Sequence, residues 1–78
     1  MPAAKSTDGN FVPIESEMIV AVRYLPDAQQ LDVMFRTGDK YRYVGVPPLE
    51  YTGLLSANSK GRYMHKQILK RYEFERLD

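Results

Sequence analysis

The chain has 78 residues, with 11 basic and 10 acidic side chains and a net charge of +1. A chain of this length forms one domain near the lower size limit for folding alone, and its core supplies only ~3–5 kcal/mol of net stability. It contains no cysteine, which excludes a disulfide framework and a thiolate metal site. No stretch approaches the ~20 apolar residues of a membrane span, and the N-terminus lacks the apolar run of a signal peptide. We therefore expect a cytoplasmic protein with no membrane partner.

Strands dominate the first half of the chain. Residues 1–13 are small and polar with several Gly and Pro, so we expect a flexible arm there and a single domain over residues 14–78. Three strand-like runs follow, at Met18–Leu25, Leu31–Thr37 and Lys40–Val46. Because the gaps between them are short enough for hairpins, the sequence predicts a three-stranded antiparallel meander.

Two helices are predicted after the strands. A Pro-Pro pair ends the sheet, and Pro48 suits the first turn of a helix over residues 49–57. Asn58 can take the left-handed conformation that ends this helix, and Ser59 is a good N-cap for a longer helix that runs to Tyr72. Two helices on one face of the sheet give an α+β fold in the order β-β-β-α-α.

The turn between the second and third strands decides which face two tyrosines occupy. A two-residue loop at Gly38-Asp39 places Met34 opposite Tyr43 and puts both Tyr41 and Tyr43 on the face away from the core. A three-residue loop pairs Tyr43 with Phe35 and puts both tyrosines inside, because a slip by one residue exchanges the faces. Gly-Asp suits a hairpin turn, so we favour the two-residue loop. The core strands then contribute Leu31, Val33, Phe35, Val44 and Val46.

The second helix has one apolar and one basic side. At about 100° per residue, one arc holds Gly61, Met64, His65, Ile68, Leu69 and Tyr72. The other arc holds no carboxylate and carries five cations, here called the basic strip: Lys60, Arg62, Lys66, Lys70 and Arg71. Tyr63 and Gln67 lie within the same arc. A chain of nearly zero net charge therefore gathers positive charge along one helix.

The basic strip has two interpretations. It can contact nucleic-acid phosphates, in which case binding weakens with salt because counterions are released, and Tyr63 can stack on an unpaired base. It can equally be a solvated helix face, since long basic side chains are ordinary there. Lys70 and Arg71 also suit the C-terminal end of a helix.

Tyr41 and Tyr43 also have two interpretations. As in sheet-based RNA-binding domains, two aromatic rings on a strand can form a platform on which bases stack. Tyrosine is also a common packing residue on half-buried sheets, where its flat ring is covered and its hydroxyl reaches the surface.

No residue pattern points to catalysis or to a bound cofactor or metal. His65 is the only histidine and has no cysteine or nearby carboxylate with which to build a metal site, so we expect it at the edge of the core with a satisfied hydrogen bond. The acids are scattered over turns and strand flanks, and none forms the pair needed for general acid and base. We expect a protein that is not an enzyme and has no cofactor.

The order of several short motifs resembles the KTSC domain family, named after the C-terminal extension of some lysyl-tRNA synthetases and also found as a small free-standing bacterial protein. The resemblance covers roughly residues 16–74. It rests on Leu31-x-Val33-x-Phe35, Tyr41-Arg42-Tyr43, Val46-Pro47, Tyr51, Ala57-x-Ser59-x-Gly61-x-Tyr63 and Ile68 to Tyr72. It implies a compact α+β module with a link to tRNA or other RNA. Where the family pattern suggests a phenylalanine-asparagine type of pair, this chain has Met64-His65.

Two functions follow from the sequence. The first is RNA binding, to tRNA or a single strand, through the basic strip, with Tyr63, Tyr41 and Tyr43 adding stacking. The alternative is a protein-interaction module or homodimer that uses a sheet edge and a patch formed by the tyrosines and Met34.

Overall fold

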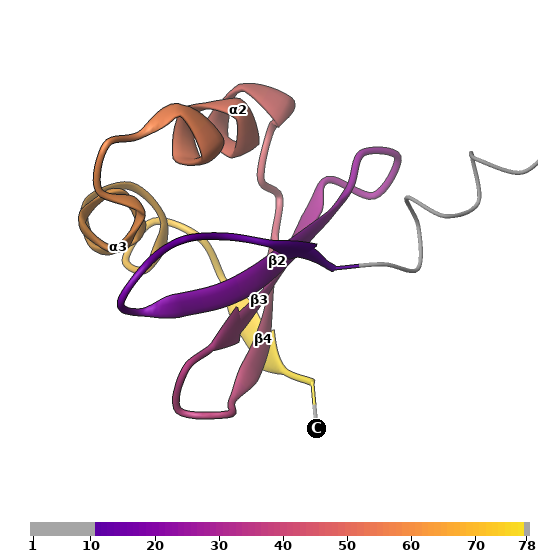
Figure 1. Ribbon diagram of the computed structural model, residues 1–78. Coiled ribbons are helices and arrows are strands. Elements are labelled where there is room, and N and C mark those ends of the chain that lie inside the picture. Colours follow the sequence, from indigo (N-terminus) through magenta and orange to yellow (C-terminus); the bar gives the residue numbers. More distant parts are fainter. Residues whose placement is uncertain (1–10, 78) are drawn as a thin grey trace, which may run out of the picture.

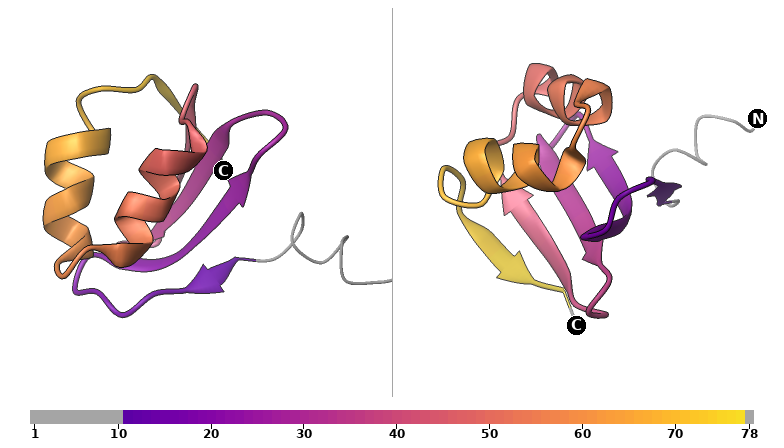
Figure 2. Two further views of the ribbon diagram at one scale, coloured as in Figure 1. Left: turned by 90° about the horizontal axis from the view of Figure 1, so that it is seen from above. Right: turned by 60° about the vertical axis from the view of Figure 1, so that its left-hand side comes forward.

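The computed structural model describes residues 11–77 and places five antiparallel strands in the order β1-β2-β3-β4-β5. The strands are β1 (Val12–Pro13), β2 (Ile19–Leu25), β3 (Gln30–Phe35), β4 (Lys40–Val44) and β5 (Phe74–Arg76). Between β4 and β5 come α2 (Pro48–Ser56) and α3 (Lys60–Tyr63), and α3 continues as the π-helical segment η1 (Met64–Ile68). The helical segments lie together on one side of the sheet (Figure 1, Figure 2), so the predicted α+β two-layer arrangement is confirmed.

The sheet has five strands and not the predicted three. The meander of β2, β3 and β4 is confirmed, and a short strand is added at each edge. β1 falls in the predicted arm and pairs with β2 through Val12 and Val22, while residues 1–10 of that arm lie outside the described residues. β5 places Phe74 opposite Tyr43 of β4. Both added strands lack an apolar pattern of their own. They are stabilised by pairing with a neighbouring strand more than by their composition, so the sequence pattern did not predict them.

The hairpin between β3 and β4 closes with Phe35 bonded to Asp39, which leaves a loop of three residues, 36–38, so the favoured two-residue loop is wrong. The N–H of Phe35 donates to the carbonyl of Asp39 at 2.9 Å, and the N–H of Gly38 donates to the carbonyl of Phe35 at 2.9 Å. Gly38 has a φ of +100°, the left-handed region that suits glycine as the last residue of a three-residue hairpin loop. A hydrogen bond of 3.1 Å from the Thr37 hydroxyl to the Asp39 carboxylate supports the turn.

This loop puts Tyr41 and Tyr43 on the face that packs against the helices, as the alternative register predicted. Tyr43 lies opposite Leu31, however, and not opposite Phe35, because the two strands are offset further than either register assumed. Val44 is on the outer face and half-buried, so its predicted place in the core is wrong. The core between the sheet and the helices consists of Ile14, Ile19, Val22, Leu31, Val33, Phe35, Tyr43, Val46, Leu54, Met64 and Ile68.

The start of α3 is as predicted, whereas the end of α2 is not. The Ser59 side chain accepts a hydrogen bond from the N–H of Arg62 at 3.3 Å, which confirms Ser59 as the N-cap. Asn58 does not take a left-handed conformation, since Gln29 is the one non-glycine residue with positive φ among residues 11–77. α2 ends instead at Ala57 in an extended conformation. No helix within the described part of the chain has the length and apolar character needed to cross a bilayer.

A tyrosine pair fastens α2 to the sheet. The rings of Tyr24 in β2 and Tyr51 in α2 are stacked, with centroids 4.7 Å apart and an interplanar angle of 12°. The Tyr24 hydroxyl donates to the carbonyl of Val46 at 2.5 Å, which ties the segment before α2 to the same ring. Stacked pairs of this kind add to the stabilisation that burial of the rings already provides.

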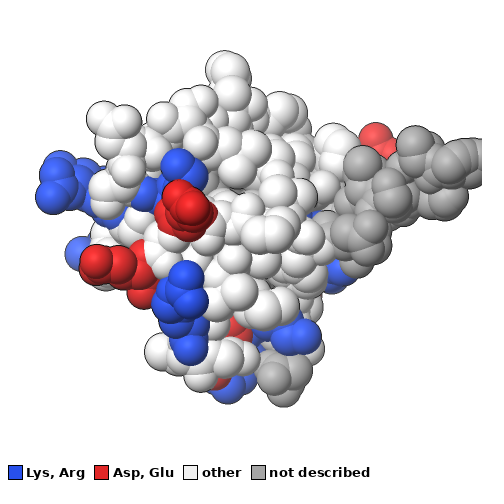
Figure 3. Space-filling view, viewed as in Figure 1, with Lys and Arg blue, Asp and Glu red and all other residues white. Residues whose placement is uncertain are grey.

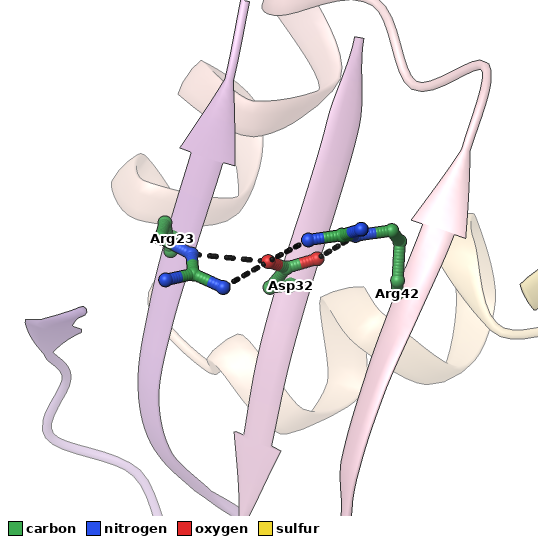
Figure 4. Close-up of polar contacts among 3 residues, drawn as sticks. All are labelled: Arg23, Asp32 and Arg42. Atoms are coloured by element: carbon green, nitrogen blue, oxygen red, sulfur yellow. Dashed lines mark hydrogen bonds and ion pairs between the residues drawn. The ribbon is translucent and has the colours of Figure 1, made fainter. Parts of the chain in front are cut away.

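The outer face of the sheet carries a row of charges that the sequence analysis missed. Asp32 in β3 is fully buried and lies between Arg23 of β2 and Arg42 of β4 (Figure 4). Arg23 donates to it at 2.7 and 3.0 Å, and Arg42 donates at 2.8 and 3.0 Å. Glu75 of β5 lies opposite Arg42 and continues the alternation, and the Arg23 guanidinium lies 4.5 Å from the centroid of the Phe11 ring. One level of the sheet thus carries charges of alternating sign from β2 to β5.

Candidate nucleic-acid interface

The basic strip lies along α3, η1 and the turn that follows them. Arg62, Lys66 and Lys70 are exposed, and within residues 11–77 none of the three forms an ion pair with a carboxylate. Lys60 is half-buried, and its ammonium donates to the carbonyl of Ala57 at 2.8 Å, so it helps to close the end of α2. Arg71 is also exposed, and its guanidinium donates to the Gln67 side chain, so four cations of the strip face solvent without an ion pair to a carboxylate within residues 11–77.

The π-helical turn changes which side chains share a face. The N–H of Leu69 donates to the carbonyl of Met64, five residues back, at 2.9 Å. In a regular α-helix, Tyr63 and Tyr72 are nine residues apart and lie roughly on opposite sides at about 100° per residue. In the structure both hydroxyls reach the same carboxylate, that of Glu50 in α2. The Tyr63 side chain, which the helix pattern placed on the solvent side, therefore points toward α2.

Glu50 links the two helical segments through these tyrosines. The Tyr63 hydroxyl donates at 2.6 Å and the Tyr72 hydroxyl at 2.8 Å. The hydrogen bond to Glu50, together with burial, raises the pKa of Tyr63 to about 12, because the carboxylate disfavours the phenolate. Gly53 leaves room for this ring, since a side-chain Cβ there would lie 2.9 Å from the Tyr63 Cζ. A glycine in mid-helix was the one sequence signal of this contact.

Replacing Glu50 with glutamine is expected to lower the pKa of Tyr63 from about 12 toward its ordinary value of 10.0, because the hydrogen bond to the Glu50 carboxylate is the largest cause of the shift and a neutral amide is a weaker acceptor. The measurement is an NMR pH titration of the protein labelled with ¹³C at tyrosine Cζ. Tyr43 is the internal reference, since burial raises its pKa to about 12 independently of Glu50. Glu73→Gln, at an exposed position, is the matched control. An unchanged Tyr63 titration in a folded Glu50→Gln variant contradicts the assignment.

A small hollow lies between the end of α2 and the basic strip. Its volume is about 260 Å³, and it is lined by Ala57, Asn58, Ser59, Arg62, Tyr63, Lys66 and Gln67. Arg62 and Lys66 supply its two positive charges, and the side-chain amides of Asn58 and Gln67 supply neutral donors. Arginine, lysine and amide donors are the groups that contact phosphate and sugar in nucleic-acid complexes. The hollow is therefore the part of the strip best suited to a nucleotide.

Acidic side chains limit the basic surface around this helix. In the view of Figure 3, Lys and Arg side chains at the left edge, over α3, have Asp and Glu side chains beside them. Glu50 is one acid that the helix pattern could not reveal, since it comes from α2 and contacts Tyr63. The helix itself contains no carboxylate in this arc, and the acids beside it come from other elements.

The structure does not bring Tyr41 and Tyr43 to the basic strip. Tyr43 is 2% exposed, so neither face of its ring is open to a base. Tyr41 is half-buried, with edge contacts to the rings of Phe35 and Phe74 at 5.9 and 5.4 Å between centroids. Met34 lies on the opposite face of the sheet from both tyrosines, so the predicted patch of tyrosines and Met34 does not form. Alternation along β3 and β4 separates these side chains once the register is known.

His65 is exposed on η1 and does not lie at the edge of the core, as the sequence analysis expected. The core positions of η1 are Met64 and Ile68, which are fully buried. No group of three or more His, Cys, Asp or Glu side chains that could hold a metal ion occurs within residues 11–77.

Relatives of the chain include both free-standing proteins and parts of larger ones. An uncharacterized protein from Stutzerimonas stutzeri is 38% identical over 69 residues, which cover 86% of this chain and 96% of that protein. A lysine–tRNA ligase from Nostoc sp. is 40% identical over 63 residues, which cover 81% of this chain and 11% of the ligase. The chain thus spans about a tenth of the ligase, but nearly all of the smaller relative.

A solved structure and a family profile also match this chain. The crystal structure of a KTSC domain protein from Yersinia pestis matches with a TM-score of 0.86 and 30% sequence identity, covering 88% of this chain and 97% of that chain. The profile of the KTSC domain matches residues 15–72, from the segment before β2 to the end of the helical layer. The chain therefore belongs to the KTSC domain family.

Proposed function

We propose that this domain binds RNA, as tRNA or as a single strand, through the exposed cations of α3 and η1. The observation that carries the proposal is the hollow at the end of α2, where Arg62 and Lys66 converge and neither has a carboxylate partner within residues 11–77. Lys70 and Arg71 extend the same surface toward the end of the helical layer. Two relatives named lysine–tRNA ligase contain a segment 40% and 36% identical to this chain, which supports an RNA partner.

The role of each side chain in this interface follows from its contacts. Arg62, Lys66 and Lys70 contact phosphates, and the Arg71 guanidinium donates to the Gln67 side chain at 2.8 Å, which holds it along the helix. Tyr63 lines the hollow and can offer its ring to a base while its hydroxyl stays on Glu50. Lys60 remains on the Ala57 carbonyl and contributes only through its charge. Tyr43 is not part of the interface because it is buried.

Affinity should depend strongly on salt because the attraction is local. The net charge of the chain is only +1, so long-range attraction is weak and a few phosphate contacts must supply most of the binding. The logarithm of the association constant falls with the logarithm of salt concentration by roughly 0.7 for each phosphate contact to a single strand.

The double variant Arg62→Glu/Lys66→Glu is expected to weaken binding of a labelled single-stranded RNA by at least about tenfold at low salt, and to reduce the salt slope by roughly 1.4 for two lost contacts. The measurement is fluorescence anisotropy at several salt concentrations, with bulk tRNA titrated in parallel. Arg36→Glu/Lys40→Glu is the matched control, because it changes the net charge equally at the β3–β4 hairpin. Equal loss in the control variant, or no binding of either RNA at low salt by the unmodified protein, overturns the proposal.

A further inference from the structure

The two edges of the sheet differ in their capacity to accept another strand. β1 has two residues and ends in Pro13, which has no N–H to donate. β5 lies at the opposite edge and contains no proline (Figure 2). The hydrogen bond just before β5 shows how β5 pairs with β4: the N–H of Val44 donates to the carbonyl of Glu73 at 2.9 Å. Hydrogen-bonding direction alternates along an antiparallel strand, so the N–H and C=O of Phe74 point away from β4 toward the open edge.

An apolar groove lies beside this edge. Its volume is about 620 Å³, within the range of ligand-binding pockets, and its apolar lining comes from Met18, Phe35, Tyr41, Tyr43, Leu69 and Phe74. Phe74 is 57% exposed, although its ring packs against Tyr41 and Tyr43. Asp39 also lines the groove and forms an ion pair of 2.6 Å with Arg76 of β5. A strand beside β5 would place every second side chain against Phe74 and the groove.

Charge argues against a second copy of this chain as the occupant. A two-fold antiparallel pairing of β5 with itself must be centred on residue 74, 75 or 76. These registers set Glu73 opposite Glu75, Glu75 opposite Glu75, or Arg76 opposite Arg76 of the other copy. Like charges directly opposite each other destabilise a strand pair. A strand with a basic residue opposite Glu75 instead complements the outer face at this edge.

We infer that β5 binds an extended segment of another protein, which pairs with Phe74 as a sixth strand. The segment has an apolar side chain over the groove and a lysine or arginine opposite Glu75. Within β5, only Phe74 and Arg76 direct their N–H and C=O groups to this edge. So short a ladder supplies the register, and the groove supplies most of the affinity. This surface involves β5 and the hairpin side of the sheet, and it is separate from the hollow between α2 and α3.

The test is selection of seven-residue peptides from a random displayed library against the whole protein, followed by anisotropy titrations of the enriched peptides. Enriched peptides are expected to alternate apolar and basic residues. Phe74→Ala should weaken them at least tenfold, and Glu75→Lys should weaken them about tenfold while favouring a charge-swapped peptide with glutamate at the basic position. Val12→Ala at the other edge is the control and should leave the affinity unchanged.

Several results would overturn the inference. These are the absence of enriched peptides, or affinities that stay the same in both β5 variants while circular dichroism shows each variant folded. A concentration-dependent dimer in sedimentation that Phe74→Ala abolishes would make a second copy the occupant. RNA binding that is lost in Phe74→Ala and kept in Arg62→Glu/Lys66→Glu would assign this edge to RNA. The last result also separates failure of this inference from failure of the proposed RNA site.

Discussion

Replacing Asp32 with asparagine is expected to lower the free energy of unfolding by roughly 3 kcal/mol, measured by urea denaturation, because it removes the one carboxylate that Arg23 and Arg42 share. The estimate lies at the low end for a broken buried ion pair, since the side chains of Arg23 and Arg42 keep 20% and 25% exposure. Such a loss removes most of the ~3–5 kcal/mol available to a domain of this size. The variant should therefore be partly unfolded at room temperature.

Asp39→Asn is the matched control for this prediction. Asp39 also pairs with an arginine, Arg76, at 2.6 Å, but the pair is exposed, with 55% and 36% side-chain exposure. An exposed ion pair contributes at most about 1 kcal/mol. If the two asparagine variants lose equal stability, the buried position of Asp32 is not the reason for its importance.

The pH dependence of the free energy of unfolding should also show the contribution of the Asp32 carboxylate. Burial raises the pKa of Asp32, but the hydrogen bonds from Arg42 and Arg23 outweigh it and hold the pKa below its ordinary value of 3.8. A lowered native pKa means that the stabilisation is fully present above the unfolded value and is lost as the pH falls through the native value. The free energy of unfolding of the unmodified protein should thus drop more steeply below pH 3.8 than that of Asp32→Asn. Parallel curves for the two proteins contradict the assignment.

Replacing Ile68 with alanine is expected to lower the free energy of unfolding by about 3 kcal/mol, whereas His65→Ala should change it by less than about 0.5 kcal/mol. Ile68 is fully buried in the core and His65 is exposed, although both lie on the apolar arc of a regular α-helix. Met64 and Ile68, four residues apart on η1, face the core, whereas His65 on the same segment faces solvent. Urea denaturation of both variants measures it.

Ile68→Val keeps this prediction testable when Ile68→Ala does not fold. It should lower the free energy of unfolding by about 1 kcal/mol, since it removes one buried methylene. Similar losses in His65→Ala and Ile68→Ala would mean that both residues contact the core, and would contradict the prediction.

The central strands and the helix start follow from local patterns. β-branched runs bounded by turn residues are read correctly as β2, β3 and β4, because each run can bury one face whichever neighbour it meets. Ser59 is recognised as an N-cap for the same reason, since its side chain satisfies an N–H only three residues away. The edge strands escape detection, because Phe74–Arg76 becomes a strand only through hydrogen bonds to β4.

The positions of the tyrosines depend on geometry that no local pattern contains. A loop of three residues in place of two moved Tyr41 and Tyr43 to the inner face, and the choice rests on the left-handed conformation of Gly38. The contact of Tyr63 and Tyr72 with Glu50 needs both the π-helical turn and the approach of α2. Neither condition can be derived from the spacing of residues in one helix.

The sequence by itself determined the fold class, the central meander, the helix cap and the existence of the basic strip, since these depend on residue type and short-range spacing. The tertiary structure alone decided which cations remain available, where the tyrosines lie, and that Asp32 unites two arginines across three strands. These features join residues distant in sequence, such as Glu50 with Tyr72 and Asp32 with Arg42. Their energies come from burial and pairing, which exist only once the strands and helices have packed together.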